Sequence, residues 1–482
     1  LVSPLSSTIS STITITGQNF NSTPSNNIVF FGASRGTVIG GSSTTLSVTV
    51  PYGAAYQYIS VTDLVTDFTA YSTKPFIVAY PTPVGSFNDF APAVNVGLGS
   101  GTPNTFNQQV IKDFNGDGKP DIVVGTTTGL YLLTNQTTAG SSAISFTAQA
   151  ISLSLNIQAL AGDDLDGDGK PDLALNPTSG LLLVYKNVSA VGGSISFSSV
   201  SFPALGNTSF YSVAINDIDG DGRPDVVMGA NGGTAVYIYR NTSVSGTIYF
   251  DPFVGGYPTG SSSAIALAIG DIDGDGKPDL VTANYTVSSN LSVMRNTTAG
   301  PGNISFATAV NFSSASYNYS RSLALGDFNG DGKLDVAVDH YGNSVNNVSV
   351  FPNISVSGTI NFSTSVLLAT SSLGSNTQAV AIGDVNGDGK PDLVVSDYNA
   401  TIVSVLKNIT TSTPTITFAN YAGYVDLAGT NSRSVANNIN LVDFNGDGML
   451  DIVRCNYGTS NLSIFRNIQF FPPTISSFSP IT

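Results

Sequence analysis

Short apolar runs bounded by turn residues make up most of this chain, and from about residue 84 they recur in groups of four. In one group the run Ala264–Ile269 leads into a polar loop, and Asp279–Ala283 follows that loop directly. Leu291–Asn296 then alternates apolar and polar residues, and Ile304–Phe306 ends the group. Runs of this length predict four short β-strands in each group, named A to D in chain order.

The polar loop between strands A and B is the most regular feature of the sequence. Its first copy reads Asp113-Phe-Asn-Gly-Asp-Gly-Lys-Pro-Asp121, and six further copies follow at spacings of 51 to 59 residues. A repeat of this length suits a four-stranded propeller blade and is too long for a calcium-binding β-roll. The seven copies therefore predict an all-β fold with a seven-bladed β-propeller over residues 84–470.

The two ends of the repeat array predict how the ring closes. The seventh repeat has strands A to C, but the chain then runs into Phe471-Pro-Pro-Thr474, and proline disfavours a central strand. A spare apolar run, Ser86–Phe90, precedes the first repeat. We expect this run to be the outer strand of blade seven, because an open seam would leave unpaired strand edges.

The first 80 residues lack the repeat and predict a separate immunoglobulin-like β-sandwich. Its expected strands are Thr12–Thr16, Asn27–Phe31, Thr45–Val50, Tyr58–Thr62 and Pro75–Val78. The segment Tyr80-Pro-Thr-Pro83 would be a fairly stiff linker. The predicted domains are thus residues 1–80, the propeller at 84–470, and a C-terminal tail at 471–482.

Composition supports an all-β, exported protein. The 482 residues include 32 Asp and no Glu, which is a good helix former, with 50 Gly and 23 Pro for turns. The formal charge of −15 argues against nucleic acid and anionic membranes as partners. No apolar run is long enough for a transmembrane helix, and a start at Leu1 fits either removal of an export signal or trimming of a longer chain. The lone Cys455 is expected in a buried strand.

The A–B loops have the pattern Asp-x-Asp/Asn-x-Asp-Gly-x-x-Asp, which is typical of a calcium site. Calcium takes six to eight oxygen ligands. Positions 1, 3 and 5 would supply side-chain oxygens, position 7 a backbone carbonyl, and position 9 a carboxylate from strand B, while glycine at position 6 permits the sharp turn. Of the 32 Asp, 24 occupy these positions, and seven Ca²⁺ would bring +14 against the formal −15.

The predicted metal ligands share these five positions in each loop. They are Asp113, Asn115, Asp117, Lys119, Asp121, Asp164, Asp166, Asp168, Lys170, Asp172, Asp217, Asp219, Asp221, Arg223, Asp225, Asp271, Asp273, Asp275, Lys277, Asp279, Asp327, Asn329, Asp331, Lys333, Asp335, Asp384, Asn386, Asp388, Lys390, Asp392, Asp443, Asn445, Asp447, Met449 and Asp451. Loops with the neutral Asn at position 3 are expected to bind calcium less tightly than those with Asp. Because each site joins two strands of one blade, we expect the calcium to be structural.

These motifs carry a resemblance to known families. The run Val380-Ala-Ile-Gly-Asp-Val-Asn-Gly-Asp-Gly-Lys-Pro-Asp-Leu-Val-Val395 resembles the FG-GAP/VCBS repeat of integrin α subunits and bacterial surface proteins, over about residues 84–467. The resemblance implies a seven-bladed propeller with calcium in the A–B loops. Ile13–Phe20, Val29–Gly32 and Leu46–Pro51 are similar to IPT/TIG immunoglobulin-like domains. The pairing resembles exported surface proteins of the Bacteroidetes type.

Asn-x-Ser/Thr triplets occur 17 times, and six of them end strand C. Either they are glycosylated, or the repeat has copied a triplet that is common in such a composition; a bacterial source favours the second interpretation. These six are Asn135, Asn187, Asn241, Asn296, Asn353 and Asn408.

The sequence does not assemble a catalytic site. His340 is the only histidine, has no positioned nucleophile beside it, and is expected in an exposed loop. We therefore expect a non-enzymatic extracellular structural or adhesive protein that binds itself or a surface protein or glycan. Two alternatives remain open: a calcium-dependent glycan-binding module, and a hydrolase with two carboxylates in the propeller channel.

The tail at 471–482 contains Pro473–Pro480, which looks like the first strand of an IPT/TIG domain. The N-terminal domain begins at Leu1-Val-Ser-Pro4, where that strand should already be ending. One hypothesis is that the tail is donated to the next subunit and builds a head-to-tail filament. The other is that a further domain begins there.

Overall fold

The computed structural model describes residues 2–79, 90–98, 106–203, 210–230, 232–244, 246–251, 256–261, 263–286, 290–314, 319–341, 347–369, 377–397, 402–411, 413, 415–419, 422–425, 439–456 and 461–468. Within these ranges every regular element is a β-strand except one 3₁₀ turn, η1 (Pro24–Asn26). No helix in this part of the chain is long and apolar enough to cross a membrane.

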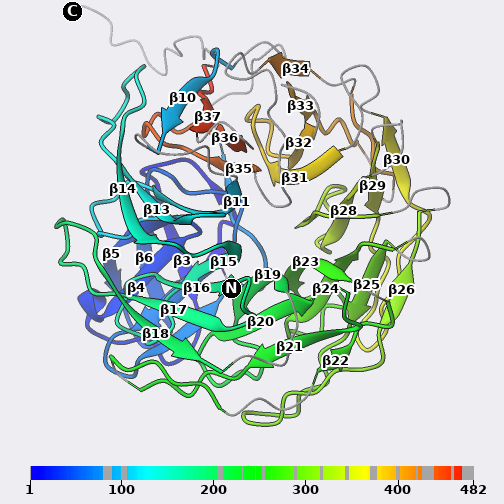
Figure 1. Ribbon diagram of the computed structural model, residues 1–482, viewed down its shortest axis with the longest axis horizontal. Helices are drawn as coiled ribbons and strands as arrows, with labels where there is room; N and C mark the ends of the chain where they lie inside the picture. Colours follow the sequence, from blue (N-terminus) through cyan, green and yellow to red (C-terminus); the bar gives the residue numbers. More distant parts are fainter. Residues whose placement is uncertain are drawn as a thin grey trace, which may run out of the picture.

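Seven four-stranded antiparallel sheets form a ring of blades around a central axis (Figure 1). Blades one to six take their strands in chain order: β11 (Phe106–Lys112), β12 (Asp121–Thr126), β13 (Gly129–Asn135), β14 (Phe146–Leu153); β15 (Ile157–Asp163), β16 (Asp172–Pro177), β17 (Leu182–Asn187), β18 (Phe197–Phe202); β19 (Phe210–Asn216), β20 (Asp225–Ala230), β21 (Ala235–Tyr239), β22 (Tyr257–Pro258); β23 (Ala264–Gly270), β24 (Asp279–Asn284), β25 (Leu291–Met294), β26 (Val310–Phe312); β27 (Leu323–Gly326), β28 (Asp335–His340), β29 (Asn347–Phe351), β30 (Val366–Ala369); β31 (Thr377–Gly383), β32 (Asp392–Asp397), β33 (Ile402–Leu406), β34 (Ala422–Val425). Blade seven combines β35 (Ile439–Val442), β36 (Asp451–Asn456) and β37 (Asn461–Phe465) with β10 (Val94–Gly97).

Strand B of each blade is buried on both faces, because neighbouring blades pack against its two sides. The side chains of β24 are buried throughout, as are those of β28. Apolar clusters lie between adjacent blades; one joins Val281 and Val293 of blade four to Val336 and Phe351 of blade five. The continuous apolar runs of the B strands thus follow from burial on two faces.

The ring closes with a strand from before the first repeat, as predicted, but the residues differ. The outer strand of blade seven is β10, in which Val96 pairs with Leu462. Within the predicted run Ser86–Phe90, residues 86–89 lie outside the described residues, and Phe90 makes a single bridge to Asn467. Val94–Gly97 is the better strand because Val96 packs into the apolar cluster between blades seven and one.

The outer strand of blade four also begins later than predicted. Phe306, at the end of the predicted run Ile304–Phe306, makes only an isolated bridge to Asn296, and the strand proper is β26. The Phe306 ring instead packs edge-on against Tyr257 of blade three, at 5.2 Å between centroids. The Ile-x-Phe run therefore joins two blades before the outer strand starts.

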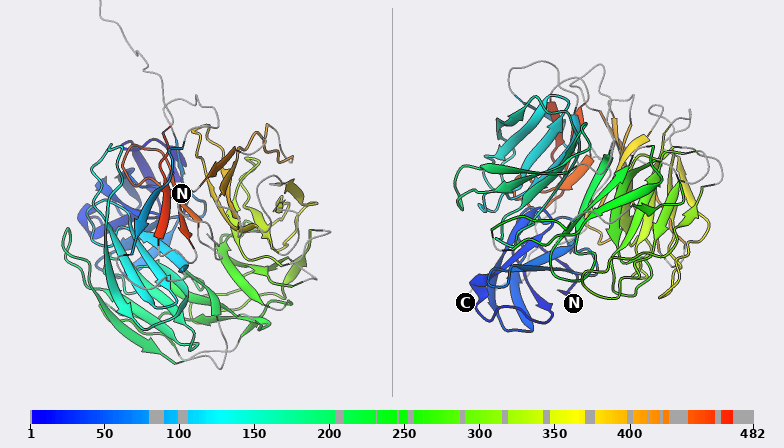
Figure 2. Two further views of the ribbon diagram at one scale, coloured as in Figure 1. Left: turned by 45° about the horizontal axis from the view of Figure 1, so that its top comes forward. Right: turned by 60° about the horizontal axis from the view of Figure 1, so that its bottom comes forward.

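The N-terminal domain is a β-sandwich-like unit of nine short strands. They are β1 (Val2–Ser3), β2 (Ser6–Ser7), β3 (Thr12–Thr16), β4 (Asn27–Phe31), β5 (Ser34–Gly41), β6 (Thr45–Thr49), β7 (Ile59–Asp63), β8 (Phe68–Tyr71) and β9 (Ile77–Val78). Its core includes Phe31 and Phe76, whose rings meet edge-on at 5.1 Å. The domain lies against one face of the propeller (Figure 2).

The domain has more of a first strand than its start at Leu1 led us to expect. β1 pairs with β3, and β2 pairs with β9 in parallel, so residues 2–7 fill the first-strand position. The tail sequence Pro473–Pro480 suggested one long first strand, whereas the structure has two short strands, β1 and β2, in its place. The tail itself lies outside the described residues, and the chain's own β1 and β2 take part of the place that a donated strand was expected to fill.

A ring of seven buried asparagines joins the blades. Each stands just after or at the end of strand C, and its side-chain amide donates two hydrogen bonds. In blade four, Asn296 Nδ2 donates to the carbonyl of Pro278 in its own loop at 3.0 Å and to that of Ile218 in blade three at 2.9 Å. Where blade one meets blade seven, Asn135 Nδ2 likewise donates to the carbonyl of Phe444 at 3.0 Å. The ring consists of Asn135, Asn187, Asn241, Asn296, Asn353, Asn408 and Asn467.

The same geometry explains the Asn-x-Ser/Thr triplets. Asn296 Oδ1 accepts the N–H of Thr298, and Thr298 Oγ1 accepts the N–H of Ser305 at 3.1 Å. The hydroxyl residue is thus required by the turn that leads to the outer strand. Because the six predicted asparagines are at most 1% exposed, with both amide hydrogens bonded to carbonyls, the fold leaves no room for a glycan on them.

Deleting Val94–Gly97 should open the edge of blade seven, lower the melting temperature and cause aggregation, because strand β37 would lose its hydrogen-bonded neighbour. Light scattering coupled to size exclusion measures this. Replacing the exposed Val94 with Thr is the control and should leave a monomer. A deletion variant that stays monomeric with an unchanged melting temperature would show that β10 does not close the ring.

Asn296→Ala should lower the free energy of unfolding by about 2–4 kcal/mol, because two buried carbonyls and one N–H lose their partner. Asn303→Ala is a matched control: Asn303 also begins an Asn-x-Ser triplet but is exposed, and its loss should cost about 0.5 kcal/mol or less. Chemical denaturation measures both. In a glycosylating host, glycan mapping should find no occupancy at Asn296, and a glycan there would contradict the structure.

Candidate metal centres

Each A–B loop is shaped by carboxylates that accept main-chain hydrogen bonds. In blade four, Asp271 at position 1 accepts the N–H of Gly274 at 2.8 Å and that of Gly276 at 2.9 Å. Gly276 has φ of 88°, a left-handed conformation that favours glycine. Asp279 at position 9 is the first residue of β24 and accepts the N–H of Ile272 and of Asn296. All seven loops fold in this way.

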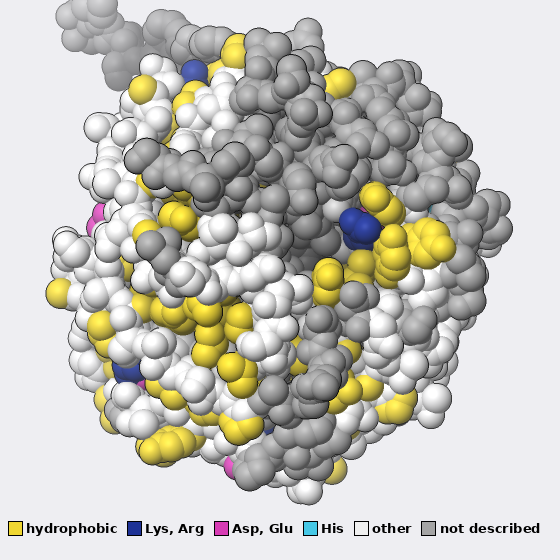
Figure 3. Space-filling view, viewed as in Figure 1, with side chains coloured by type: hydrophobic (Ala, Val, Ile, Leu, Met, Phe, Trp, Pro, Cys, Tyr) yellow, Lys and Arg dark blue, Asp and Glu magenta, His cyan; other side chains and the backbone are white. Residues whose placement is uncertain are grey.

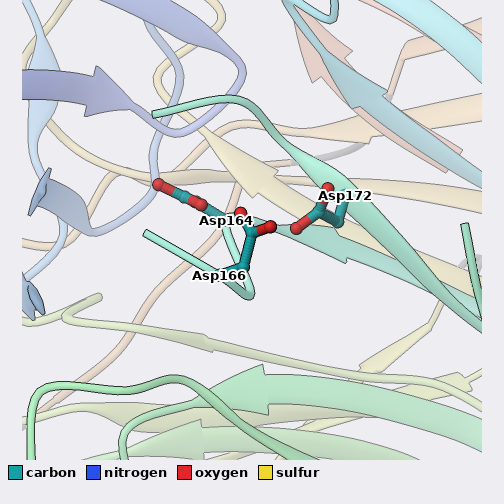
Figure 4. A group of neighbouring side chains, drawn as sticks. All are labelled: Asp164, Asp166 and Asp172. Carbon is teal, nitrogen blue, oxygen red and sulfur yellow. The ribbon is translucent and has the colours of Figure 1, made fainter. Parts of the chain in front are cut away.

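Positions 1, 3 and 9 converge in the three loops that have Asp at position 3. One ligand oxygen from each of the three carboxylates lies within 4.8 Å of the others in every such group. Figure 4 shows Asp164, Asp166 and Asp172 brought together where the loop meets β16. The groups are Asp164, Asp166 and Asp172; Asp217, Asp219 and Asp225; and Asp271, Asp273 and Asp279.

In the other four loops an asparagine occupies position 3, and in three of them its amide donates to a carboxylate. Asn445 Nδ2 donates to Asp447 at position 5 at 2.9 Å, and Asn386 Nδ2 donates to Asp392 at position 9 at 2.8 Å. Each of these loops still offers three carboxylates at positions 1, 5 and 9 and one amide oxygen. The donor set at these positions in all seven loops is therefore oxygen alone, which suits a hard divalent cation.

Burial makes these carboxylates costly to ionise without a cation. It raises the pKa of Asp121 to about 8, and the pKa of Asp279 and of Asp335 to about 7. At position 1 it raises the pKa of Asp113 to about 6. Neighbouring carboxylates add to the effect, as Asp113 and Asp117 do for Asp121. A divalent cation would reverse this balance, because it stabilises the charged form.

Cations from strand C flank several loops, a feature that the sequence interpretation missed. Arg240 lies 2.5 Å from Asp219 and from Asp221 in blade three, and Lys186 contacts Asp166 in blade two. Weaker pairs join Arg295 to Asp275 at 3.7 Å and Lys407 to Asp388 at 3.3 Å. These residues each precede a ring asparagine in sequence, and that adjacency could have identified them. In blades two and three they offset part of the extra charge at position 3, and the affinity order expected from the number of carboxylates stays a prediction.

Four of the side chains at position 7 reach the turn after strand C, and Lys170 and Arg223 also lie 3.6 and 3.7 Å from the position 5 carboxylate of their own loops. Lys277 Nζ donates to the carbonyl of Thr298 at 2.7 Å, and Arg223 Nε donates to that of Ser243 at 2.8 Å. Both acceptors lie two residues after a ring asparagine. These side chains thus stabilise the turn after strand C.

The N-terminal domain sits on the face that carries these loops. Asp113 N–H donates to the Ala33 carbonyl at 2.7 Å, and Thr69 N–H donates to the Gly222 carbonyl at 2.7 Å. Asp327 N–H donates to Tyr56 Oη at 3.1 Å. Loops of blades one, three and five therefore bind the domain through position 1 or position 6.

Tyrosines of the N-terminal domain fit positions where blades lack a side chain. The last residue of strand A is Gly270 in blade four, and a Cβ there would lie 2.7 Å from Tyr58 Oη. In blade two the equivalent residue is Asp163, and it accepts a hydrogen bond from Tyr71 Oη at 3.0 Å. A cavity of about 410 Å³ remains between these tyrosines and the inner strands, and Lys112 and Asp163 are charged residues in its lining.

Two single residues complete the comparison with the sequence. His340 is not exposed: it is 2% accessible at the end of β28, its Nε2 contacts Ser349 Oγ at 2.7 Å, and burial lowers its pKa to about 4. Cys455 is buried in β36 as predicted, and burial raises the pKa of its thiol. Its Sγ donates to Gln109 Oε1 at 3.3 Å.

The chain is similar to several distant solved structures. They include BBS1N in complex with ARL6DN (15% identity, 78% of this chain and 97% of that one, TM-score 0.48). An Agrocybe aegerita lectin that recognises non-reducing terminal N-acetylglucosamine has 16% identity over 83% of this chain and 90% of its own, with a TM-score of 0.42. A Bacillus licheniformis rhamnogalacturonan lyase has 13% identity over 95% of this chain and 88% of its own, with a TM-score of 0.42. A comparison with curated proteins found no match.

Family comparisons identify both parts of the chain. The FG-GAP-like repeat matches residues 113–175, 164–228, 217–282, 271–338 and 340–395, each match beginning in or near an A–B loop except the last. The IPT/TIG domain matches residues 1–76. Together with the seven-bladed ring and the loop geometry, these matches show that the chain belongs to the FG-GAP-like repeat family and carries an N-terminal IPT/TIG domain.

Proposed function

We propose that this protein is a secreted, non-enzymatic adhesive module in which up to seven calcium ions stabilise the propeller. FG-GAP-like repeats and IPT/TIG domains are typical of extracellular, surface-type proteins. The observation that carries the calcium proposal is the set of oxygen-only loops with buried carboxylates whose pKa is raised by burial. Such groups are stable as carboxylates only with a cation at hand.

The residues present fit calcium. Positions 1, 3, 5 and 9 and the carbonyl of position 7 would hold the ion, and Asp121, Asp279 and their equivalents would link it to strand B. Bound calcium would supply charge neutralisation. The chain's own residues do the rest: the ring asparagines fix position 9, and the flanking cations balance the charges that remain.

The channel cavity favours a non-enzymatic function. Glycosidases need two carboxyl groups facing across the substrate. Among the described residues that line the cavity, Asp163 is the only carboxylate, and it is engaged by Tyr71. The hydrolase alternative therefore lacks its second group at this place.

A binding function fits the face of the propeller that the N-terminal domain leaves free. Self-association through the tail at 471–482 stays a prediction. A glycan-binding module that used the calcium loops directly would compete with the IPT/TIG domain for the loops of blades one, three and five.

Removing calcium with EDTA should lower the melting temperature by about 10 °C or more, because an ion that binds only the folded state stabilises it by mass action. Calorimetry with and without Ca²⁺ measures this, and elemental analysis counts the ions. The double variant Asp271→Asn/Asp279→Asn should lose one ion. No bound metal together with an unchanged melting curve would refute the proposal.

The metal-free protein should become less stable as the pH rises from about 4 to 8. Its folded-state carboxylates have raised pKa values, about 6 for Asp113 and about 8 for Asp121, so the folded state holds protons that the unfolded chain releases above about 4. Stability gained by protonation is therefore lost through this window. Saturating Ca²⁺ should flatten the dependence, and identical pH profiles with and without Ca²⁺ would contradict it.

Calcium removal should also loosen the IPT/TIG domain, because loops of blades one, three and five supply its docking contacts. Small-angle scattering should show a larger radius of gyration in EDTA. Gly270→Ala should have a similar effect with calcium present, because the added methyl meets Tyr58 Oη. Gly326→Ala is the milder control, since its Cβ would lie 3.4 Å from Tyr56 Oη. An unchanged radius in EDTA would show that docking does not depend on the loops.

A further inference from the structure

An arginine surrounded by tyrosines lies on the face of the propeller opposite the calcium loops. Tyr285 and Tyr341 directly follow β24 and β28, which start at position 9, so both lie at the far ends of those strands. Arg321 precedes β27 and lies at the same end. The other half-exposed Lys and Arg of the described part accompany the A–B loops or the N-terminal domain.

The guanidinium of Arg321 is held flat by aromatic rings. Its central carbon is 3.7 Å from the centroid of Tyr341 and 5.0 Å from that of Tyr285. Tyr285 packs in turn on Tyr319 at 4.6 Å, with 37° between the ring planes. Main-chain bonds fix the rings: Tyr341 N–H donates to the Tyr319 carbonyl at 2.8 Å. Stacking of this kind orients a guanidinium and leaves its edge for hydrogen bonds.

A buried carboxylate holds the backbone of Arg321 and leaves its side chain free. Asp339 Oδ1 accepts the N–H groups of Arg321 and Ser322, each at 2.7 Å. Asp339 Oδ2 and Arg321 Nε have no hydrogen-bond partner within the described structure. The guanidinium makes one long bond, from Nη2 to Tyr285 Oη at 3.4 Å, and no ion pair with any described carboxylate.

The surrounding face suits an anionic ligand despite the net charge of −15. The loops that contain 24 of the 32 Asp all lie on the other face. Figure 3 views the free face and shows, right of its centre, a basic group flanked by hydrophobic side chains. Among the described residues, the carboxylate beside this arginine is that of Asp339, which is buried and accepts main-chain hydrogen bonds.

We propose that Arg321, Tyr285, Tyr319 and Tyr341 form a binding site for a uronic acid unit of an acidic polysaccharide. The sugar carboxylate would accept hydrogen bonds from the terminal guanidinium nitrogens, which match its planar geometry. The half-exposed tyrosine rings would pack on the apolar face of the sugar ring, and their hydroxyls would bond its hydroxyls. An acidic peptide would use the arginine alone, whereas a uronate uses both the charge and the rings. This inference rests on the adhesive function proposed above and names its ligand.

The test is calorimetric titration of the full chain, in Ca²⁺, with a galacturonate trisaccharide and with its methyl ester. The acid should bind, and the ester should bind about tenfold more weakly or worse, because it removes the charge-assisted bonds. Arg321→Gln should weaken binding of the acid by about tenfold or more. Arg321→Lys should weaken it by several-fold, because lysine cannot donate two parallel hydrogen bonds to one carboxylate. Lys74→Gln, which removes one exposed charge from the N-terminal domain, should leave affinity unchanged.

Several results would overturn the site: no binding of the acid at millimolar concentration, equal binding of acid and ester, or an undiminished affinity in Arg321→Gln. Binding of a hexa-aspartate peptide without binding of the trisaccharide would equally overturn it, in favour of a protein ligand. Tyr341→Phe removes only a hydroxyl and keeps the ring that stacks on Arg321. It therefore tests the site with a variant that should fold even if Arg321→Gln does not. Calcium-dependent melting of the same variants is read separately, so that failure of this site and failure of the calcium proposal are distinguishable.

Discussion

Burial of one carboxylate at the start of every strand B is the constraint on which the propeller depends. Asp279 and its six equivalents are fully inaccessible, and each accepts one N–H from its own loop and one from the ring asparagine of its blade. The asparagine amide then reaches the preceding blade. The A–B loop, the start of strand B and the contact with the preceding blade are therefore joined by one set of hydrogen bonds. A substitution of the carboxylate would disturb two blades at once.

The same units explain why the loops tie the ring together around its circumference. In blades three and four the carboxylate at position 3 also accepts an N–H from the next blade: Asp219 from Gly302, and Asp273 from Gly358, both at 2.7 Å. A cation bound at position 3 would act on a group that already contacts its neighbour. Calcium in these loops would thus strengthen contacts between blades as well as within them, although each loop belongs to one blade.

How much the sequence could predict depended on whether a feature repeats. The loops, the blade count and the buried B strands follow from residues that recur seven times, and the structure has them at the predicted positions. Features that depend on a single tertiary contact were missed. β10 replaced Ser86–Phe90 because Val96 finds an apolar cluster that only the closed ring creates, and His340 is buried because the D–A connection covers it. The first strand of the N-terminal domain was missed because two short pairings do the work of one long strand.

The distribution of charge divides the propeller into two chemically different faces. Carboxylates and their balancing cations gather at the A–B loops, where the IPT/TIG domain also docks. The opposite face carries the B–C and D–A connections, which are free of the metal motif and can differ from blade to blade without harming it. Arg321 and its tyrosines occur in the connections of blades four and five alone among the described residues. A ring built from equal repeats thus acquires a unique position on its free face, which is what recognition of a single ligand requires and what the seven equivalent metal loops cannot supply.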